Sequence, residues 1–161
     1  FILSLVFLNF VFSQTSTNKV YDLKVIAKSK KDYSISGMDN IGNVNADDPQ
    51  LTFEVDSEIN FFIDAQGHPF YLKLVPGVGK KNQVQNIPNN GTSSGKITWK
   101  PEKEGTYYYQ CSKHKNMTGK IVIQIKFLSY KFQELMIKLC LWTDLCHQQV
   151  VGVELQIFKL L

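Results

Sequence analysis

Three side chains with metal-binding chemistry lie within seven residues of one another. Cys111, His114 and Met117 fall in the run Cys-Ser-Lys-His-Lys-Asn-Met. A thiolate, an imidazole and a thioether at this spacing can converge on one ion if the chain turns between them. Soft sulfur combined with imidazole suits copper, and a His₂Cys set with a long axial methionine is typical of copper sites that transfer electrons. Such a set needs one more histidine.

His68 is the candidate for the missing ligand. The chain has three histidines, and His147 lies in a C-terminal tail of different character. His68 stands in the run Gln-Gly-His-Pro-Phe-Tyr, where a turn enters a strand. The ligand loop holds no second cysteine, so we expect a mononuclear site. Three histidines are also too few for a three-copper oxidase cluster, a multi-histidine dismutase site or a second copper site of the nitrite reductase kind.

The elements that must position these residues are strands. Period-two alternation of apolar residues flanks the turn Asp-Ser-Glu at 56–58, and further turn signals recur between residues 39 and 105. Helical patterning is lacking from 15 to 125. This pattern predicts an all-β antiparallel sandwich of seven or eight strands. Cys111 then ends one strand, Met117 leads into the next, and His114 lies at the tip between them.

These motifs resemble those of the cupredoxins, the type 1 blue copper family. The pattern Cys-x₂-His-x₂-Met followed by Gly119-Lys120 is similar to the short ligand loop of amicyanin, in the plastocyanin/azurin group. The run Trp-Lys-Pro-Glu-Lys-Glu-Gly-Thr-Tyr at 99–107 resembles the approach to the copper cysteine in that group. The resemblance covers roughly residues 18–125. It implies a Greek-key, cupredoxin-like sandwich.

The resemblance also implies a cofactor, one type 1 copper ion. Its equatorial ligands would be His68, Cys111 and His114, and its axial ligand would be Met117. Two positions depart from the family pattern. Pro69 stands where family members commonly have an asparagine that braces the two ligand loops, which affects the surroundings of the ligands and the redox potential. Gln110 stands where plastocyanin has an aromatic residue on a route for electrons.

The function implied is that of a one-electron carrier cycling between Cu(I) and Cu(II), not an enzyme. The alternative is a cupredoxin-like binding module, for copper storage or delivery or as a copper-free adhesion domain, and Pro69 keeps this alternative open. A carrier should show a reversible couple and fast self-exchange. A storage or delivery protein should hold Cu(I) far better and release it to an acceptor.

Composition bears on the partners. All 18 basic residues are lysines and the net charge is +4. Without arginine forks for phosphates and bases, a nucleic-acid partner is not expected. Lys113, Lys115 and Lys120 surround His114, with Lys80 and Lys81 in a nearby loop, so we expect acidic redox proteins as partners. A carrier of this size is expected to be monomeric. Lysines on an exposed loop are also ordinary solvated residues.

The two ends of the chain differ from its middle. Residues 1–13 resemble the remnant of a signal peptide, which predicts export to a periplasm, a lumen or the extracellular space, and the apolar run is too short to span a membrane. Residues 14–126 form the expected copper-binding domain. Residues 127–161 have helical spacing and are either an amphipathic helix or an artefact of the gene model. Cys140 and Cys146 in this tail have only loose metal-ligand spacing.

Overall fold

The computed structural model describes residues 18–125. The predicted signal-peptide remnant, the tail after residue 126 and the ends of the predicted domain lie outside these residues, so export and the domain limits stay predictions. Within the described range no helix is long and apolar enough to cross a membrane. The described chain forms nine strands: β1 Val20–Ile26, β2 Ser34–Met38, β3 Asn43–Asp47, β4 Leu51–Glu54, β5 Glu58–Asp64, β6 Phe70–Lys73, β7 Ser94–Trp99, β8 Gly105–Cys111 and β9 Thr118–Gln124.

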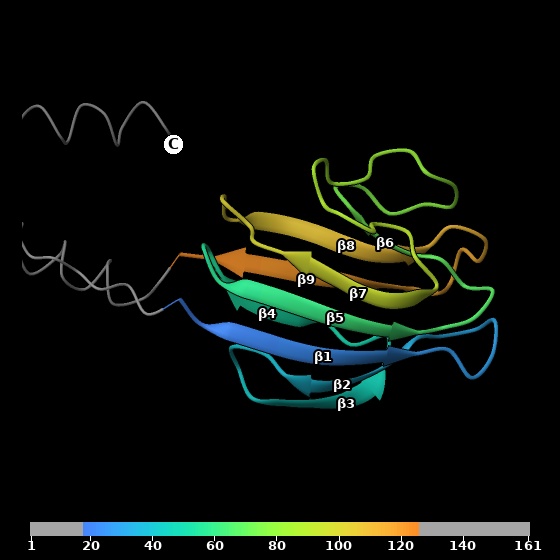
Figure 1. Cartoon of the computed structure of the whole chain (residues 1–161), viewed down its shortest axis with the longest axis horizontal. Helices are drawn as coiled ribbons and strands as arrows, with labels where there is room; N and C mark the ends of the chain where they lie inside the picture. The colour runs from blue at the N-terminus through green and yellow to red at the C-terminus, as the bar shows by residue number, and fades with distance from the viewer. Residues whose placement is uncertain (1–17, 126–161) are drawn as a thin grey trace, which may run out of the picture.

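The strands form two sheets. One sheet has the order β3-β2-β1-β5-β7 and the other the order β4-β9-β8-β6, and the two lie face to face (Figure 1). The all-β sandwich is confirmed, with nine strands in the described range instead of seven or eight. Two pairings, β1 with β5 and β4 with β9, are parallel. Alternating burial is the same for parallel and antiparallel neighbours, so the sequence pattern did not reveal their direction.

The core lies between the sheets and follows the period of two. In β1 the buried residues Tyr21, Leu23 and Val25 alternate with exposed ones. In β8, Tyr109 and Cys111 are fully buried, while Tyr107 is partly buried and packs against the core cluster. Both tyrosines therefore share the core face with Cys111. The strand that ends in Cys111, the predicted ligand, is therefore anchored along its inner face.

A close approach between Tyr109 and Gly119 supports the hairpin of β8 and β9, which carries the predicted ligand loop. Tyr109 on β8 pairs with Gly119 on β9. The Tyr109 ring stacks on Phe70, with centroids 5.5 Å apart, and its hydroxyl donates to the Pro49 carbonyl at 2.8 Å. A Cβ at position 119 would lie 2.0 Å from the Tyr109 hydroxyl oxygen. Because the ring is held on both sides, only glycine fits opposite it.

We expect Gly119→Ala to lower the free energy of unfolding of the copper-free chain by about 1–3 kcal/mol, the usual cost of overpacking a core. Urea denaturation measures the loss. In the background Tyr109→Leu, which removes the clashing ring atoms, Gly119→Ala should cost much less. An equal cost in both backgrounds would contradict the steric explanation, because the two substitutions would then be additive.

Candidate metal centre

The predicted ligand loop is a closed hairpin connection. β8 ends at Cys111 and β9 begins at Thr118. The Cys111 amide donates to the Met117 carbonyl at 2.9 Å, which joins the two ends of the loop. His114 lies between these ends, as the strand-loop-strand pattern predicted, and is half-buried. The loop lies at the right-hand end of the sandwich in Figure 1, between β8 and β9.

His68 enters the site from a turn before β6. Its amide donates to the Ala65 carbonyl at 2.9 Å, and Gly67 at the third position of this turn has φ +79°. That left-handed conformation is the one that glycine adopts without a steric penalty. One residue later, the Pro69 carbonyl accepts a hydrogen bond from the Ser112 amide at 3.2 Å. A backbone hydrogen bond therefore joins the two segments that carry the predicted ligands.

Three donor atoms converge on one point. His68 Nδ1 lies 3.2 Å from His114 Nδ1, and Cys111 Sγ lies 3.5 Å from His114 Nδ1. One ligand atom from each of the three residues lies within 4.8 Å of the other two. Nitrogen and sulfur ligands of a tetrahedral ion, at about 2.0 and 2.3 Å from it, would be separated by about 3.3 Å (N to N) and 3.5 Å (N to S). The two separations that involve His114 match these values, which is compatible with a shared soft metal ion.

Met117 lies at the base of the same loop. Its side chain is fully buried within the core cluster, and its carbonyl is bonded to the Cys111 amide. A thioether in this place is shielded from water, which favours the weak axial contact expected of it. The assignment of Met117 as the axial ligand stays a prediction.

The surroundings of the site favour a neutral His68. Cys111 is buried, while His68 and His114 are half-buried. Burial lowers the pKa of His68, and the nearby His114 and the positive charge of Lys113 lower it further. Metal ions bind the deprotonated ring nitrogen, so a lowered pKa keeps His68 in the form that can act as a ligand.

Tyr33 is a supporting residue that sequence reasoning missed. It lies just before β2 and is fully buried. Its hydroxyl lies 2.9 Å from the His68 carbonyl and 3.1 Å from the Pro69 carbonyl, so its hydrogen fixes this ligand segment. Burial, and secondarily the neighbouring Cys111, raise the pKa of Tyr33 and keep it a donor. The sequence offered only the general expectation that the hydroxyl of a buried tyrosine forms a hydrogen bond.

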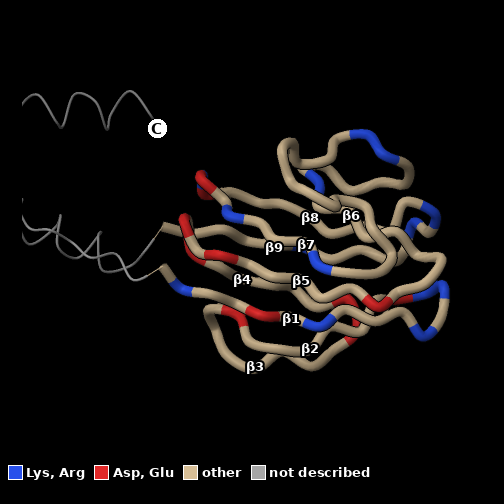
Figure 2. Tube along the Cα trace, in the orientation of Figure 1, with Lys and Arg blue, Asp and Glu red and all other residues tan. Residues whose placement is uncertain are grey.

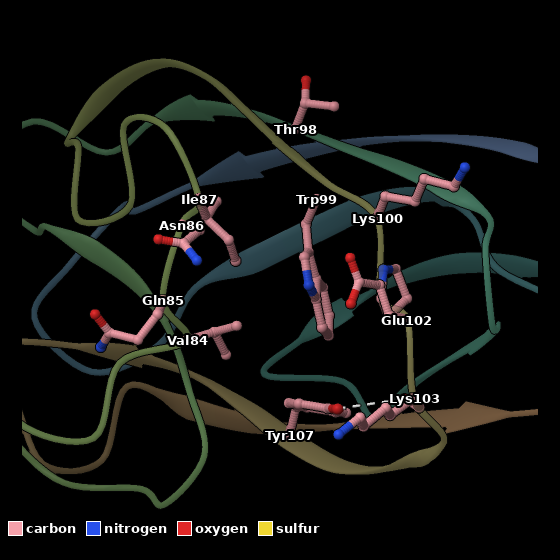
Figure 3. Close-up of a pocket in the computed structure, with 11 residues that line it drawn as sticks. Val84, Gln85, Asn86, Ile87, Thr98, Trp99, Lys100, Glu102, Lys103 and Tyr107 are labelled. Atoms are coloured by element: carbon pink, nitrogen blue, oxygen red, sulfur yellow. Dashed lines mark hydrogen bonds between the residues drawn. The ribbon is translucent and has the colours of Figure 1, made fainter.

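A separate groove lies away from the predicted ligands. It has a volume of about 430 Å³ between residues 84–87 and 98–103 (Figure 3). The rings of Trp99 and Tyr107, which line it, meet edge to face with centroids 5.0 Å apart, and the Tyr107 hydroxyl donates to the Lys103 carbonyl. None of the four predicted ligands lines this groove. The donor atoms of His68, Cys111 and His114 therefore converge at a different place from this groove.

The fold is similar to those of solved copper-protein structures. No protein-family model matches the chain, and no curated protein matches it in sequence. The structure is similar to that of the copper protein rusticyanin, with 20% identity, a TM-score of 0.43 and coverage of 65% of this chain and 76% of that one. Rusticyanin from Thiobacillus ferrooxidans at 1.27 Å gives 20% identity, a TM-score of 0.41 and coverage of 65% and 75%.

A proline-to-alanine mutant of amicyanin in its oxidized state is also similar. Its identity is 23%, its TM-score 0.32, and the match covers 47% of this chain and 69% of that one. Rusticyanin and amicyanin are cupredoxins, the family that the sequence resembles. The described chain itself is a two-sheet β-sandwich that carries a His-Cys-His cluster.

Proposed function

We propose that this protein binds one copper ion and carries single electrons between redox partners. The observation that supports this is the meeting of one thiol and two imidazoles, from Cys111, His68 and His114, within 4.8 Å. This donor set suits copper far better than magnesium or calcium, which prefer oxygen ligands. When bound, copper would supply a one-electron couple. Zinc accepts the same ligand types, so the test must distinguish the two metals.

The fold itself fixes the positions of the side chains that would bind the ion. Cys111 is the last residue of a strand and is fully buried, and the Pro69–Ser112 bond joins its loop to the segment of His68. Tyr33 holds that segment from the other side. Ligands fixed in this way change little when the charge of the ion changes, which favours a carrier. For the same reason we propose no substrate-converting activity.

The test is to add Cu(II) to the full chain, record the visible absorption spectrum and then measure voltammetry. We expect an intense sulfur-to-copper band and a reversible one-electron couple. Zn(II) should compete for the site without giving colour. A chain that stays colourless and binds no copper would overturn the proposal. The protein would then fit the alternative of a copper-free binding domain.

Copper storage or delivery is the other alternative, and it rests on Pro69. The structure supplies a brace at this position, because the Pro69 carbonyl accepts from the Ser112 amide. This observation favours the carrier. A delivery protein would bind Cu(I) much more tightly than Cu(II) and transfer it to an acceptor chelator, without the reversible couple.

We further propose that the partners are acidic at their docking face. Residues 65–101 and 105–125 contain no aspartate or glutamate. Lys113 and Lys115 on the ligand loop are exposed, and the Gly79 amide donates to the Ser112 carbonyl at 2.7 Å, which brings the loop bearing Lys80 beside them. Figure 2 shows lysines on the loops at this end of the sandwich, and acidic residues also lie there, at Asp47 and Asp64, where β3 and β5 end. The lysines next to His114 would speed association with a partner of the opposite charge.

The double variant Lys113→Gln/Lys115→Gln should slow electron transfer to an acidic redox protein at low salt and flatten the dependence of its rate on ionic strength. Screening already removes part of this attraction at about 0.15 M salt. Stopped-flow kinetics over a salt series measures the effect. Lys24→Gln/Lys103→Gln, with the same charge change elsewhere on the surface, is the control. An equal effect of both double variants would show that net charge alone matters.

A further inference from the structure

Gln110 is buried although it lies on the outer face of its sheet. It precedes Cys111 in β8 and points away from the core that Cys111 faces. Its exposed fraction is 1%, and its neighbours on the outer face of β6, Tyr71 and Lys73, are buried as well. In Figure 1 the long connection from β6 to β7 extends beyond β6 and β8. The Gly77 amide of this connection donates to Gln110 Oε1 at 3.2 Å, so the connection covers Gln110.

The carboxamide nitrogen of Gln110 contacts the ligand loop itself. Its Nε2 lies 2.8 Å from the His114 carbonyl and 3.0 Å from the Met117 carbonyl. The carbonyls of Cys111 and Lys115 lie at 3.1 and 3.4 Å. An amide nitrogen has two hydrogens, and the two shortest contacts go to two of the predicted ligand residues. The side chain is thus surrounded by the loop that carries the ligands.

The covering connection is tied to the same loop at further points. The Lys73 ammonium, also buried, donates to the Gly79 carbonyl at 2.8 Å and to the Gly77 carbonyl. The Gly79 amide in turn donates to the Ser112 carbonyl at 2.7 Å. Gln110 therefore lies between two segments that are also bonded to each other. Buried polar groups linked in this way favour one backbone arrangement, because breaking any bond leaves an unsatisfied group.

We infer that Gln110 is a positioning residue of the metal centre, whose carboxamide fixes the path of the loop bearing His114 and Met117 and locks this loop against Gly77. The inference rests on the proposed function, since it concerns the same site. It also gives a different interpretation of this position. The resemblance to plastocyanin indicated only that an aromatic residue is absent here, whereas the contacts of Gln110 indicate that it holds the predicted ligand loop.

The test compares Gln110→Met with Asn60→Leu in the full chain. Methionine keeps the length of glutamine but cannot bond the loop. Asn60 is a matched buried amide on the other sheet, 4% exposed, which donates to Asp22 and accepts from Thr98. Both variants should lose stability, because each deletes buried hydrogen bonds. Only Gln110→Met should alter the ligand loop.

Two readouts separate positioning from general destabilisation. In the copper-free chain, hydrogen exchange of the Gly77 and Cys111 amides should become about tenfold faster in Gln110→Met, the equivalent of one lost hydrogen bond, and stay unchanged in Asn60→Leu. In the copper-loaded chain, the visible band and the reduction potential should shift only in Gln110→Met. Unchanged exchange, band and potential in Gln110→Met would overturn the inference.

A measurement on the unaltered chain decides the matter if Gln110→Met fails to fold. The side-chain amide hydrogens of Gln110 should exchange much more slowly than those of exposed Gln66, because they are buried and bonded. Equal exchange rates would overturn the inference. If the wild-type chain binds no copper, the proposed function fails, while the exchange results still decide whether Gln110 holds the loop.

Discussion

Cys111→Ser is expected to abolish the intense visible band of the Cu(II)-loaded chain. The band arises from sulfur-to-copper charge transfer, and a serine hydroxyl offers no soft thiolate. Cys111 is fully buried at the end of β8, with its sulfur 3.5 Å from His114 Nδ1. No other cysteine is described within the sandwich. Absorption during a copper titration measures the loss.

The control for this result uses the two cysteines of the tail. The double variant Cys140→Ser/Cys146→Ser should keep the full band, because these residues are not part of the predicted site. Circular dichroism of Cys111→Ser should show an intact β-sandwich, since the substitution is nearly isosteric. A band that survives in Cys111→Ser but disappears in the double variant would place the copper in the tail and contradict the proposed site.

Local patterns made much of the site predictable. The spacing Cys-x₂-His-x₂-Met between two strand patterns placed Cys111 at a strand end and His114 in the loop, and the structure has both there. His68 followed from composition, since it was the remaining histidine outside the tail. The structure brings it to the other two donors across 46 residues. Local patterns placed Cys111 and His114 because the positions of these residues depend on their neighbours in the sequence, whereas His68 was predicted because few histidines were available.

The other long-range contacts around the site were not predictable from the sequence. Tyr33 reaches the His68 carbonyl from 35 residues away, and no local pattern connects the two. Gln110 gains its role only because a distant connection covers its face of the sheet. At Pro69 the resemblance predicted only that an asparagine brace is absent. That the backbone makes a bond to Ser112 depends on how closely the two loops approach.

Copper binding is expected to raise the stability of the sandwich strongly. A ligand that binds only the folded state adds RT ln(1 + [L]/Kd), or about 4 kcal/mol when free metal exceeds Kd a thousandfold. Binding of copper by cysteine or histidine in the unfolded chain would reduce this gain. Urea denaturation with saturating Cu(II), and again after removal of the metal by a chelator, measures the difference.

The gain should depend on His68, because the ion would join two segments that are 46 residues apart in the sequence. His68→Ala should lose most of the copper-dependent stability, since in this variant the remaining predicted donors, Cys111, His114 and Met117, lie in one short loop. That loop can also bind metal in the unfolded chain, which cancels the advantage of the folded state. His147→Ala, which removes a histidine outside the predicted site, is the matched control and should keep the gain. Equal gains in both variants would mean that the Cys111–Met117 loop binds the ion without His68, and that the two ligand segments do not share it.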